Sequence, residues 1–239
     1  MEHLLRDGLT TLGLSTDGVP ALMRYAELLI EKNRVMNLTA ITEPADIAAL
    51  HFLDSAALLT LTDLRGKSVV DVGTGAGFPG MPLRILEPSI RLTLLDSLNK
   101  RIDFLKEVCG DLGLADVDCV HARAEEFAAH RRESFDIVTS RAVANLQMLT
   151  ELCLPLVKVG GTFLSMKSVD SDAELEAAKK AISTLGGQVS EVKDYVIPGT
   201  DVRHRLIFIK KSKNRRKNTP DHLQKSKRIR YNRIVGLPT

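Results

Sequence analysis

The stretch Val69–Gly80 reads V-V-D-V-G-T-G-A-G-F-P-G. Its first four residues form an apolar, β-branched run around Asp71, which is typical of a buried parallel strand. The run stops at a set of closely spaced glycines, which are Gly73, Gly75, Gly77 and Gly80. Glycines at this spacing predict a turn too crowded for side chains, with a helix starting behind it. Such a turn exposes backbone N–H groups at the helix N-terminus, where a negative or polar ligand group is stabilised.

A second strand is expected at Arg91–Leu95, and Asp96 follows it. A carboxylate there can accept hydrogen bonds from both ribose hydroxyls of a nucleoside, a geometry known from dinucleotide-binding folds. Strands alternate with helices from Lys67 onward, which predicts a parallel sheet covered on both faces. We expect strands at 68–72, 91–95, 117–121, 135–140, 162–167, 189–197 and 204–209, and helices at 80–86, 100–112, about 146–156 and 171–185. The short link Pro198–Asp201 forces the last two strands to pair antiparallel.

The first sixty residues have the leucine spacing of helices. Pro20 fits the first turn of a second helix, and a third is expected from Thr42 as the N-cap through Pro44. His51 and Asp54 share a face of that helix, and spacing alone favours a surface pair or a buried, hydrogen-bonded histidine. We therefore divide the chain into an N-terminal helical extension (1–60), a Rossmann-like domain (61–210) and a basic C-terminal tail (211–239).

Charge is distributed unevenly along the 239 residues, whose formal net charge is +3. The segment Lys210–Thr239 holds 11 Lys+Arg and one acidic residue, whereas the rest holds 22 Lys+Arg and 29 Asp+Glu. An acidic body with a strongly basic tail suggests a polyanionic partner. The alternative is a solvated tail without a partner.

Composition excludes several other classes of protein. No stretch approaches the roughly 18 apolar residues of a membrane span, and the N-terminus has no signal-peptide pattern, so we expect a cytoplasmic protein. The three cysteines, Cys109, Cys119 and Cys153, have no metal-ligand spacing and are expected to be reduced, buried thiols. The six histidines form no H-x-x-x-H pattern, so we expect no metal site.

The glycine loop contains a literal G-x-G-x-x-G pattern at Gly75–Gly80, the fingerprint of dinucleotide binding. Two observations favour a different ligand. Asp71 stands at the end of the first strand, where an anion suits a cationic methionine moiety better than a pyrophosphate. The sheet also closes with an antiparallel hairpin and leaves no separate substrate domain. This combination resembles class I S-adenosylmethionine methyltransferases; glycines that serve only tight helix–strand packing are the alternative.

A more specific resemblance covers essentially residues 1–210. Its motifs occur in order at Asn37–Thr39, His51–Ser55, Asp71–Gly80, Leu95–Ser97, Lys100–Arg101, Arg123–Glu126 and Ser140–Ala142. Together they resemble the ribosomal RNA small-subunit methyltransferase G family (RsmG), also called glucose-inhibited division protein B. Tails of this family often end in Tyr-Pro-Arg-Lys-x-Gly-x-Pro, whereas Tyr231–Pro238 reads Y-N-R-I-V-G-L-P and departs at two characteristic residues.

The resemblance implies methylation of N7 of a guanine in the 530 loop of bacterial 16S ribosomal RNA, with S-adenosylmethionine as cofactor. The substrate is 16S rRNA or the small-subunit particle, and a monomer without metal is expected. The expected cofactor-binding residues are Gly73, Gly75, Gly77, Phe78, Asp96, Ala124, Glu125 and Arg141, with the last four grouped at the carboxyl edge of the sheet. The RNA-binding candidates are Lys100, Arg101, Arg123 and Arg233.

Simpler roles compete with these assignments. Glu125 and Arg141 also suit a surface ion pair or a helix-terminus charge, and Lys100 and Arg101 suit a solvated helix start. We expect removal of Arg141 to leave folding nearly intact. Guanine N7 carries a lone pair and no proton, so no catalytic acid or base is expected, and in-line positioning can supply roughly 7–11 kcal/mol. Competing functions are an NAD-dependent oxidoreductase, a methyltransferase for another RNA or a small molecule, and a non-catalytic RNA-binding module.

Overall fold

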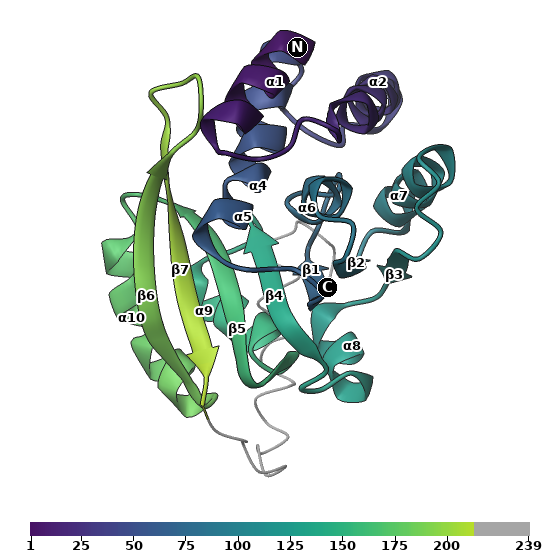
Figure 1. The fold of residues 1–239 in the computed structure, drawn as a ribbon. Helices are drawn as coiled ribbons and strands as arrows, with labels where there is room; N and C mark the ends of the chain where they lie inside the picture. The colour runs from purple at the N-terminus through teal and green to yellow at the C-terminus, as the bar shows by residue number, and fades with distance from the viewer. Residues whose placement is uncertain (213–239) are drawn as a thin grey trace.

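The computed structural model describes residues 1–212, which form a seven-stranded sheet in the order β3-β2-β1-β4-β5-β7-β6 (Figure 1). The parallel strands are β1 (Ser68–Val72), β2 (Arg91–Asp96), β3 (Asp118–His121), β4 (Phe135–Arg141) and β5 (Val157–Ser168). β7 (Arg203–Lys211) pairs antiparallel with β5, and β6 (Gly187–Val196) pairs antiparallel with β7. The expected Rossmann-like sheet with a C-terminal antiparallel hairpin is thus confirmed.

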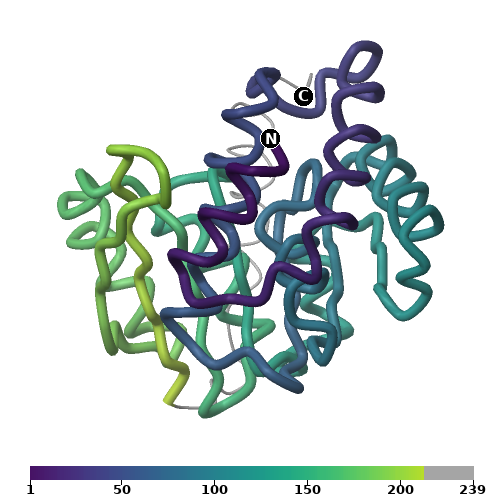
Figure 2. The backbone as a smooth tube through the Cα atoms, turned by 45° about the horizontal axis from the view of Figure 1, so that its top comes forward, coloured from purple at the N-terminus to yellow at the C-terminus, as the bar shows by residue number. Residues whose placement is uncertain are grey.

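Helices cover both faces of this sheet. One face carries α1 (Glu2–Thr11), α2 (Val19–Met36), a helical segment of four parts (α3 Pro44–Asp46, η1 Ile47–Leu53, α4 Asp54–Ala56, α5 Leu58–Leu61), α6 (Gly80–Leu86) and α7 (Asn99–Asp111). The other face carries α8 (Ala124–His130), α9 (Leu146–Cys153) and α10 (Asp172–Thr184). Figure 2 shows α2 running beside α7, and the ion pair Arg24–Asp111 joins these two helices at 2.8 Å.

Strand periodicity explains why two cores form. Side chains of a strand alternate between its faces, so Val69 packs into the core under the N-terminal helices and Val70 packs into the core under α9 and α10. The same alternation separates Leu206 from Ile207 in β7. Each buried aliphatic side chain contributes about 1.5–3 kcal/mol. The two apolar layers therefore fix the sheet against both sets of helices.

The segment from Pro44 to Leu61 differs from the expected regular helix. It begins at Pro44 with Glu43 at the N-cap, so Thr42 lies one residue too early to cap it. Its middle part, η1, is a π-helix over Ile47–Leu53. A π-turn is wider than an α-turn and occurs frequently at functional sites, and η1 brings His51 and Asp54 into the interior.

This same segment corrects the expectation about membrane spans. Pro44–Leu61 has the length and composition that a span needs, with a mean hydropathy of 1.2 over 18 residues. However, 56% of it is buried inside the fold, including Phe52 and Leu58. A core helix of a water-soluble protein has the same composition, so the segment is weak evidence for a membrane.

Two strands are longer than the sequence indicated. β5 begins at Val157 rather than residue 162, and Gly160 and Gly161 lie at an irregularity inside the strand. A Cβ on Gly161 would lie 2.6 Å from the Asp136 carbonyl oxygen, so glycine permits that close approach. β7 continues past Ile209 to Lys211, whose Nζ is buried and donates to the Leu154 carbonyl oxygen at 2.8 Å.

Candidate active site

The glycine loop after β1 lies at the carboxyl edge of the sheet, next to the end of β2. The amides of Gly73 and Thr74 both donate to the Leu95 carbonyl oxygen, at 2.8 and 3.1 Å. Gly73, Gly75 and Gly77 all have positive φ angles, of 69°, 61° and 105°. A Cβ on Gly73 would lie 2.5 Å from Val143 Cγ2. Both the left-handed backbone and the close packing therefore require glycine, as the sequence predicted.

Asp71 acts on this loop from inside. Its side chain is fully buried, and Oδ2 accepts hydrogen bonds from Thr74 Oγ1 at 2.7 Å and from the Gly80 amide at 3.0 Å. Oδ1 accepts from Thr139 Oγ1 at 3.0 Å. Burial raises the pKa of this carboxyl group, and these hydrogen bonds act in the opposite direction. The Asp71 carboxylate therefore ties the two ends of the loop together from a buried position.

Asp96 connects the glycine loop to the next turn. Its Oδ2 accepts from the Gly75 amide at 2.9 Å, and its Oδ1 accepts from the Leu98 amide at 2.9 Å. Arg101 also donates to Oδ2, at 3.2 Å, whereas Lys100 beside it is exposed. The side chain of Asp96 is only 3% exposed. The position of the Asp96 carboxylate is therefore fixed by hydrogen bonds from two turns, the glycine loop and the turn at Leu98.

The residues after β3 come to the same place. The Ala122 amide donates to the Asp96 carbonyl oxygen at 3.2 Å, and the chain then enters α8 with Arg123 at the N-cap. Ala124 is half-buried and Glu125 is exposed. The topology thus brings Ala124 and Glu125, two of the expected cofactor-binding residues, to the same edge as Asp96, because β2 and β3 are paired parallel with Asp96 opposite His121.

Arg141, at the end of β4, is not the surface residue that its simpler interpretation suggested. Nη1 donates to Asp54 Oδ2 and to the Leu50 carbonyl oxygen, both at 2.8 Å, and the side chain is 14% exposed against 0% for Asp54. Removing one partner of a buried ion pair strands the other charge. The expectation that loss of Arg141 leaves folding nearly intact is therefore not supported.

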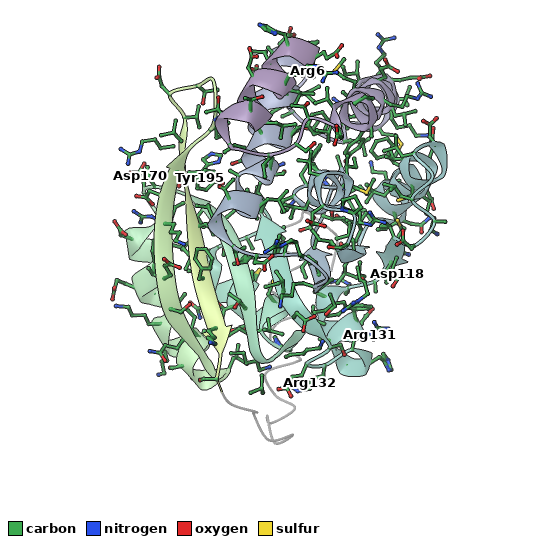
Figure 3. All side chains as sticks on the ribbon, viewed as in Figure 1. Arg6, Asp118, Arg131, Arg132, Asp170 and Tyr195 are labelled. Carbon is green, nitrogen blue, oxygen red and sulfur yellow. The ribbon has the colours of Figure 1, made fainter. Side chains whose placement is uncertain are left out.

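The hairpin β6–β7 supplies two residues that the sequence analysis missed. Tyr195 Oη donates to Asp54 Oδ1 at 2.8 Å, and His204 Nδ1 lies 2.8 Å from the same oxygen. Figure 3 shows Tyr195 near the upper end of β6, at the same edge of the sheet as the end of β4. Burial alone would raise the pKa of Asp54, but His204, Arg141 and Tyr195 together hold it below its usual value. We call Asp54, Arg141, Tyr195, His204 and His51 the Asp54 cluster.

His51 joins this cluster to the glycine loop. Its Nδ1 accepts from Arg141 Nη2 at 2.9 Å, its Nε2 lies 2.9 Å from Thr39 Oγ1, and its ring stacks on Phe78 at 4.2 Å. Burial and then the charge of Arg141 lower the pKa of His51 to about 3. The imidazole is therefore neutral near pH 7. It cannot donate a proton as an imidazolium, and it acts as a packing and hydrogen-bonding group.

Phe78 is held from both sides and is only 5% exposed. Besides His51, it stacks with Tyr25 of α2 at 5.5 Å between ring centres, and Tyr25 Oη donates to the Ala76 carbonyl oxygen. The Arg141 guanidinium lies 5.2 Å from the Phe78 ring centre, a geometry favourable for a cation–π contact. The N-terminal helices thus support the glycine loop from behind.

The structure brings most of the expected cofactor residues to one edge of the sheet. Gly73, Gly75, Asp96 and the start of α8 are joined by the hydrogen bonds above. Arg233 lies outside the described residues. Within residues 1–212, no group of three or more His, Cys, Asp or Glu side chains is arranged to hold a metal ion. The edge offers backbone amides, a fixed carboxylate and a neutral histidine, a set suited to binding and orienting.

Comparisons with known proteins agree with this geometry. The family model for GidB, rRNA small subunit methyltransferase G, matches residues 19–204. A ribosomal RNA small subunit methyltransferase G from Alkaliphilus metalliredigens is 46% identical over 89% of this chain and 91% of its own length. One from Geobacillus sp. (strain WCH70) is 46% identical over 95% and 92%. The structure of M. jannaschii TYW2 in complex with AdoMet is similar in fold, with a TM-score of 0.54 at 14% identity, over 66% of this chain and 74% of that one.

Proposed function

The chain belongs to the rRNA small subunit methyltransferase G family, and from this premise we propose that it transfers the methyl group of S-adenosylmethionine to N7 of a guanine in the 530 loop of 16S ribosomal RNA. The observation that supports this most directly is the 2.9 Å bond from the Gly75 amide to Asp96 Oδ2. It joins a glycine-rich turn to a fixed carboxylate at the carboxyl edge, where open α/β sheets bind their ligands.

The residues at this edge fit S-adenosylmethionine. Gly75 faces open space, since a Cβ there would lie 4.0 Å from its nearest neighbour, the Gly73 carbonyl oxygen, whereas a Cβ on Gly73 or Gly77 would meet packed side chains of the protein. Asp96 Oδ1 has a lone pair beyond its bond to Leu98 with which to accept from a ribose hydroxyl. We assign the adenine to the start of α8, at Ala124–Glu125. Phe78 and Arg141 contribute by supporting the loop, because the Phe78 ring stacks on His51 and the Arg141 guanidinium donates to Asp54. The bound cofactor supplies an electrophilic methyl group on a positively charged sulfur.

The reaction needs no general acid or base. Guanine N7 attacks with its lone pair and has no proton to lose, so orientation is the main requirement, and orientation supplies roughly 7–11 kcal/mol in favourable cases. The neutral His51 agrees with this, since an imidazolium beside the loop would repel the cationic cofactor. The protein's task is to hold N7 in line with the S–CH₃ bond and to exclude water.

The RNA partner is inferred from charge. Lys100 is exposed next to Arg101 at the start of α7, close to Asp96, and Arg123 begins α8 on the same edge. We propose that these cations contact phosphates near the target guanine, and that the basic segment after Ser212, which includes Arg233, contacts phosphates elsewhere. The substrate is 16S rRNA, free or in the small-subunit particle, and the enzyme works as a cytoplasmic monomer.

Transfer of labelled methyl groups tests the assignment. The protein is incubated with methyl-labelled S-adenosylmethionine and either free 16S rRNA or small-subunit particles from cells that lack the modification. The modified base is then mapped by chemical cleavage at 7-methylguanine. We expect one labelled guanine in the 530 loop. Label at another base or in a small-molecule fraction would assign another substrate, and no transfer with tight cofactor binding would indicate a binding module.

Truncation after Ser212 tests the role of the basic segment. We expect the melting temperature and cofactor affinity to stay unchanged, because a segment so rich in charge and poor in apolar residues cannot form a core of its own. RNA affinity should fall, and its dependence on salt should become shallower because fewer counterions are released. The measurement is RNA affinity at several salt concentrations for both proteins. Parallel log–log lines of equal slope would show that this segment neutralises no phosphate.

A further inference from the structure

Two cysteines face each other on the outer side of the sheet, away from the Asp54 cluster. Cys109 Sγ of α7 and Cys119 Sγ of β3 are 3.9 Å apart. Cys109 is buried and Cys119 is half-buried, whereas Cys153 is fully buried in the opposite core. We propose that Cys109 and Cys119 form a thiol-oxidation site at which a small hydroperoxide produces a disulfide.

A groove gives solvent access to this pair. Both cysteines line it, and its volume is about 250 Å³. The rest of its wall includes Gly110, Gly113 and Ala115, which carry at most a methyl group and leave space next to the sulfurs. A groove of this size admits hydrogen peroxide or a short alkyl hydroperoxide, while bulkier oxidants are restricted.

The electrostatic surroundings divide the roles of the two sulfurs. The contact between the two sulfurs lowers the pKa of Cys119, burial opposes this, and the ammonium of Lys106 lowers it further, although Asp118 acts against it. The same contact and burial raise the pKa of Cys109. Cys119 is also the more exposed of the two sulfurs, since Cys109 is buried and Cys119 is half-buried. We therefore assign Cys119 as the thiolate that attacks, because the thiolate is the nucleophilic form, and Cys109 as the resolving thiol.

The reaction balances with the hydroperoxide as the only oxidant. The Cys119 thiolate attacks the terminal oxygen of ROOH, the O–O bond breaks, and RO⁻ leaves, so that Cys119 becomes a sulfenic acid. Cys109 sulfur then attacks the Cys119 sulfur, the S–O bond breaks, and the hydroxide takes the Cys109 proton to leave as water. RO⁻ takes a proton from solvent. Two thiols and one hydroperoxide thus give one disulfide, one ROH and one water.

The backbone can accommodate the bond. A disulfide is about 2.05 Å long, so the sulfurs must approach each other from the 3.9 Å now between them. β3 is the terminal strand of the sheet and pairs only with β2, and Figure 3 shows its first residue, Asp118, at the outer edge. A terminal strand held on one side can shift more easily than an inner strand. The link from α7 to β3 contains Gly113 at a positive φ of 67°, a position of low backbone restriction.

Peptide mapping after peroxide treatment tests the proposal on the full-length protein. The protein is exposed to hydrogen peroxide at a dose that fully oxidises glutathione, then alkylated and digested without reductant. We expect a Cys109–Cys119 cross-linked peptide pair, two of three thiols lost, and full recovery with dithiothreitol. Mapping by peptide separates this from methionine oxidation. Cys153→Ser serves as the matched control and should still lose both remaining thiols.

Single variants separate the two roles. In Cys109→Ser, Cys119 should stop at the sulfenic acid and be labelled by dimedone, while in Cys119→Ser the labelling of Cys109 should fall at least tenfold. The same dimedone labelling of both variants would overturn the assigned roles. Three intact thiols in the wild type, a disulfide that joins two molecules, or equal loss of Cys153 would overturn the site itself.

Discussion

The glycine loop and the Asp54 cluster lie next to each other, yet they are built in opposite ways. The loop lies within the single stretch Gly73–Gly80, and its shape depends on glycines, which have no side chain. The cluster joins Asp54 to Arg141, Tyr195 and His204, which follow it in the sequence by 87, 141 and 150 positions. Its shape depends on buried charge. A ligand-binding turn can thus be encoded locally, whereas the support that orients it is encoded by distant residues. The two regions should therefore respond differently to substitution.

Asp54→Ala should have the largest effect on stability. The change leaves the Arg141 guanidinium buried without its carboxylate and also removes the acceptor of Tyr195 and His204. Breaking a buried pair in this way costs about 3–5 kcal/mol, so we expect a free energy of unfolding lower by that amount in urea titrations. Asp63→Ala is the control, because its pair with Arg65 is exposed and should matter little. Similar results for the two variants would remove the distinction between the regions.

Gly73→Val should affect cofactor binding more than stability. A β-branched residue is strained at a φ of 69°, and its Cβ would lie 2.5 Å from Val143 Cγ2. We expect the Kd for S-adenosylmethionine to rise more than about 100-fold, or roughly 2.7 kcal/mol, in calorimetric titrations. Gly13→Val provides a matched control. Gly13 has nearly the same φ, 68°, but a Cβ there would meet nothing within 4 Å, so the Kd should not change.

Asp96→Ala should have a somewhat smaller effect on the same measurement. The ribose hydroxyls lose a charged acceptor, which is worth about 1.5–3 kcal/mol, and the Gly75 amide loses its partner. We expect the Kd to rise by the factor that corresponds to this free energy, while the fold is retained. Asp118→Ala, on the exposed start of β3, should leave the Kd unchanged. A wild-type Kd for Asp96→Ala would exclude this carboxylate from the cofactor site.

The pH dependence of stability reports on His51. The pKa of His51 is about 3 in the folded protein and 6.5 in the unfolded chain, so the unfolded state binds more protons between these values. Stability is therefore fully present above pH 6.5 and is lost as pH falls toward 3, by at most about 1.4 kcal/mol per pH unit. His51→Gln should show a shallower slope between pH 6.5 and 4.5 in urea titrations. Equal slopes would mean that His51 is protonated freely in the folded state.

Local patterns predicted the fold well. The helix Gly80–Leu86 has the expected limits, and the short link at Pro198–Asp201 gave the antiparallel hairpin, because both depend on neighbouring residues. The prediction missed α8, a seven-residue helix in which Ala128 alone is buried, so that its apolar pattern is weak. It also missed the π-turns of η1, since the sequence there is compatible with an ordinary α-helix and tertiary packing decides the width of the turn.

The site was predictable in its ligand-facing half. The bond between Gly75 and Asp96 follows from two parallel strands ending at one edge, which chain order alone indicates. The inward direction of Arg141 does not follow, because it requires knowing that Asp54 lies beside the end of β4. Tyr195 and His204 sit in strands with no motif around them. The spacing of His51 and Asp54 was the one local signal, and burial could not be inferred from spacing.

The Asp54 cluster also has a consequence for when the site is completed during synthesis. His204 follows Asp54 by 150 residues, so at about 5–20 residues per second it is made roughly 8–30 s later. Arg141 of β4 is made 87 residues after Asp54, but the donors of the hairpin are still missing until the end of that interval. Burying the carboxylate before its donors are present would be costly. The N-terminal helices should therefore remain undocked around Asp54 until nearly the last strand has been made. The orienting half of the site is thus the last to form, although its central residue is among the first to be translated.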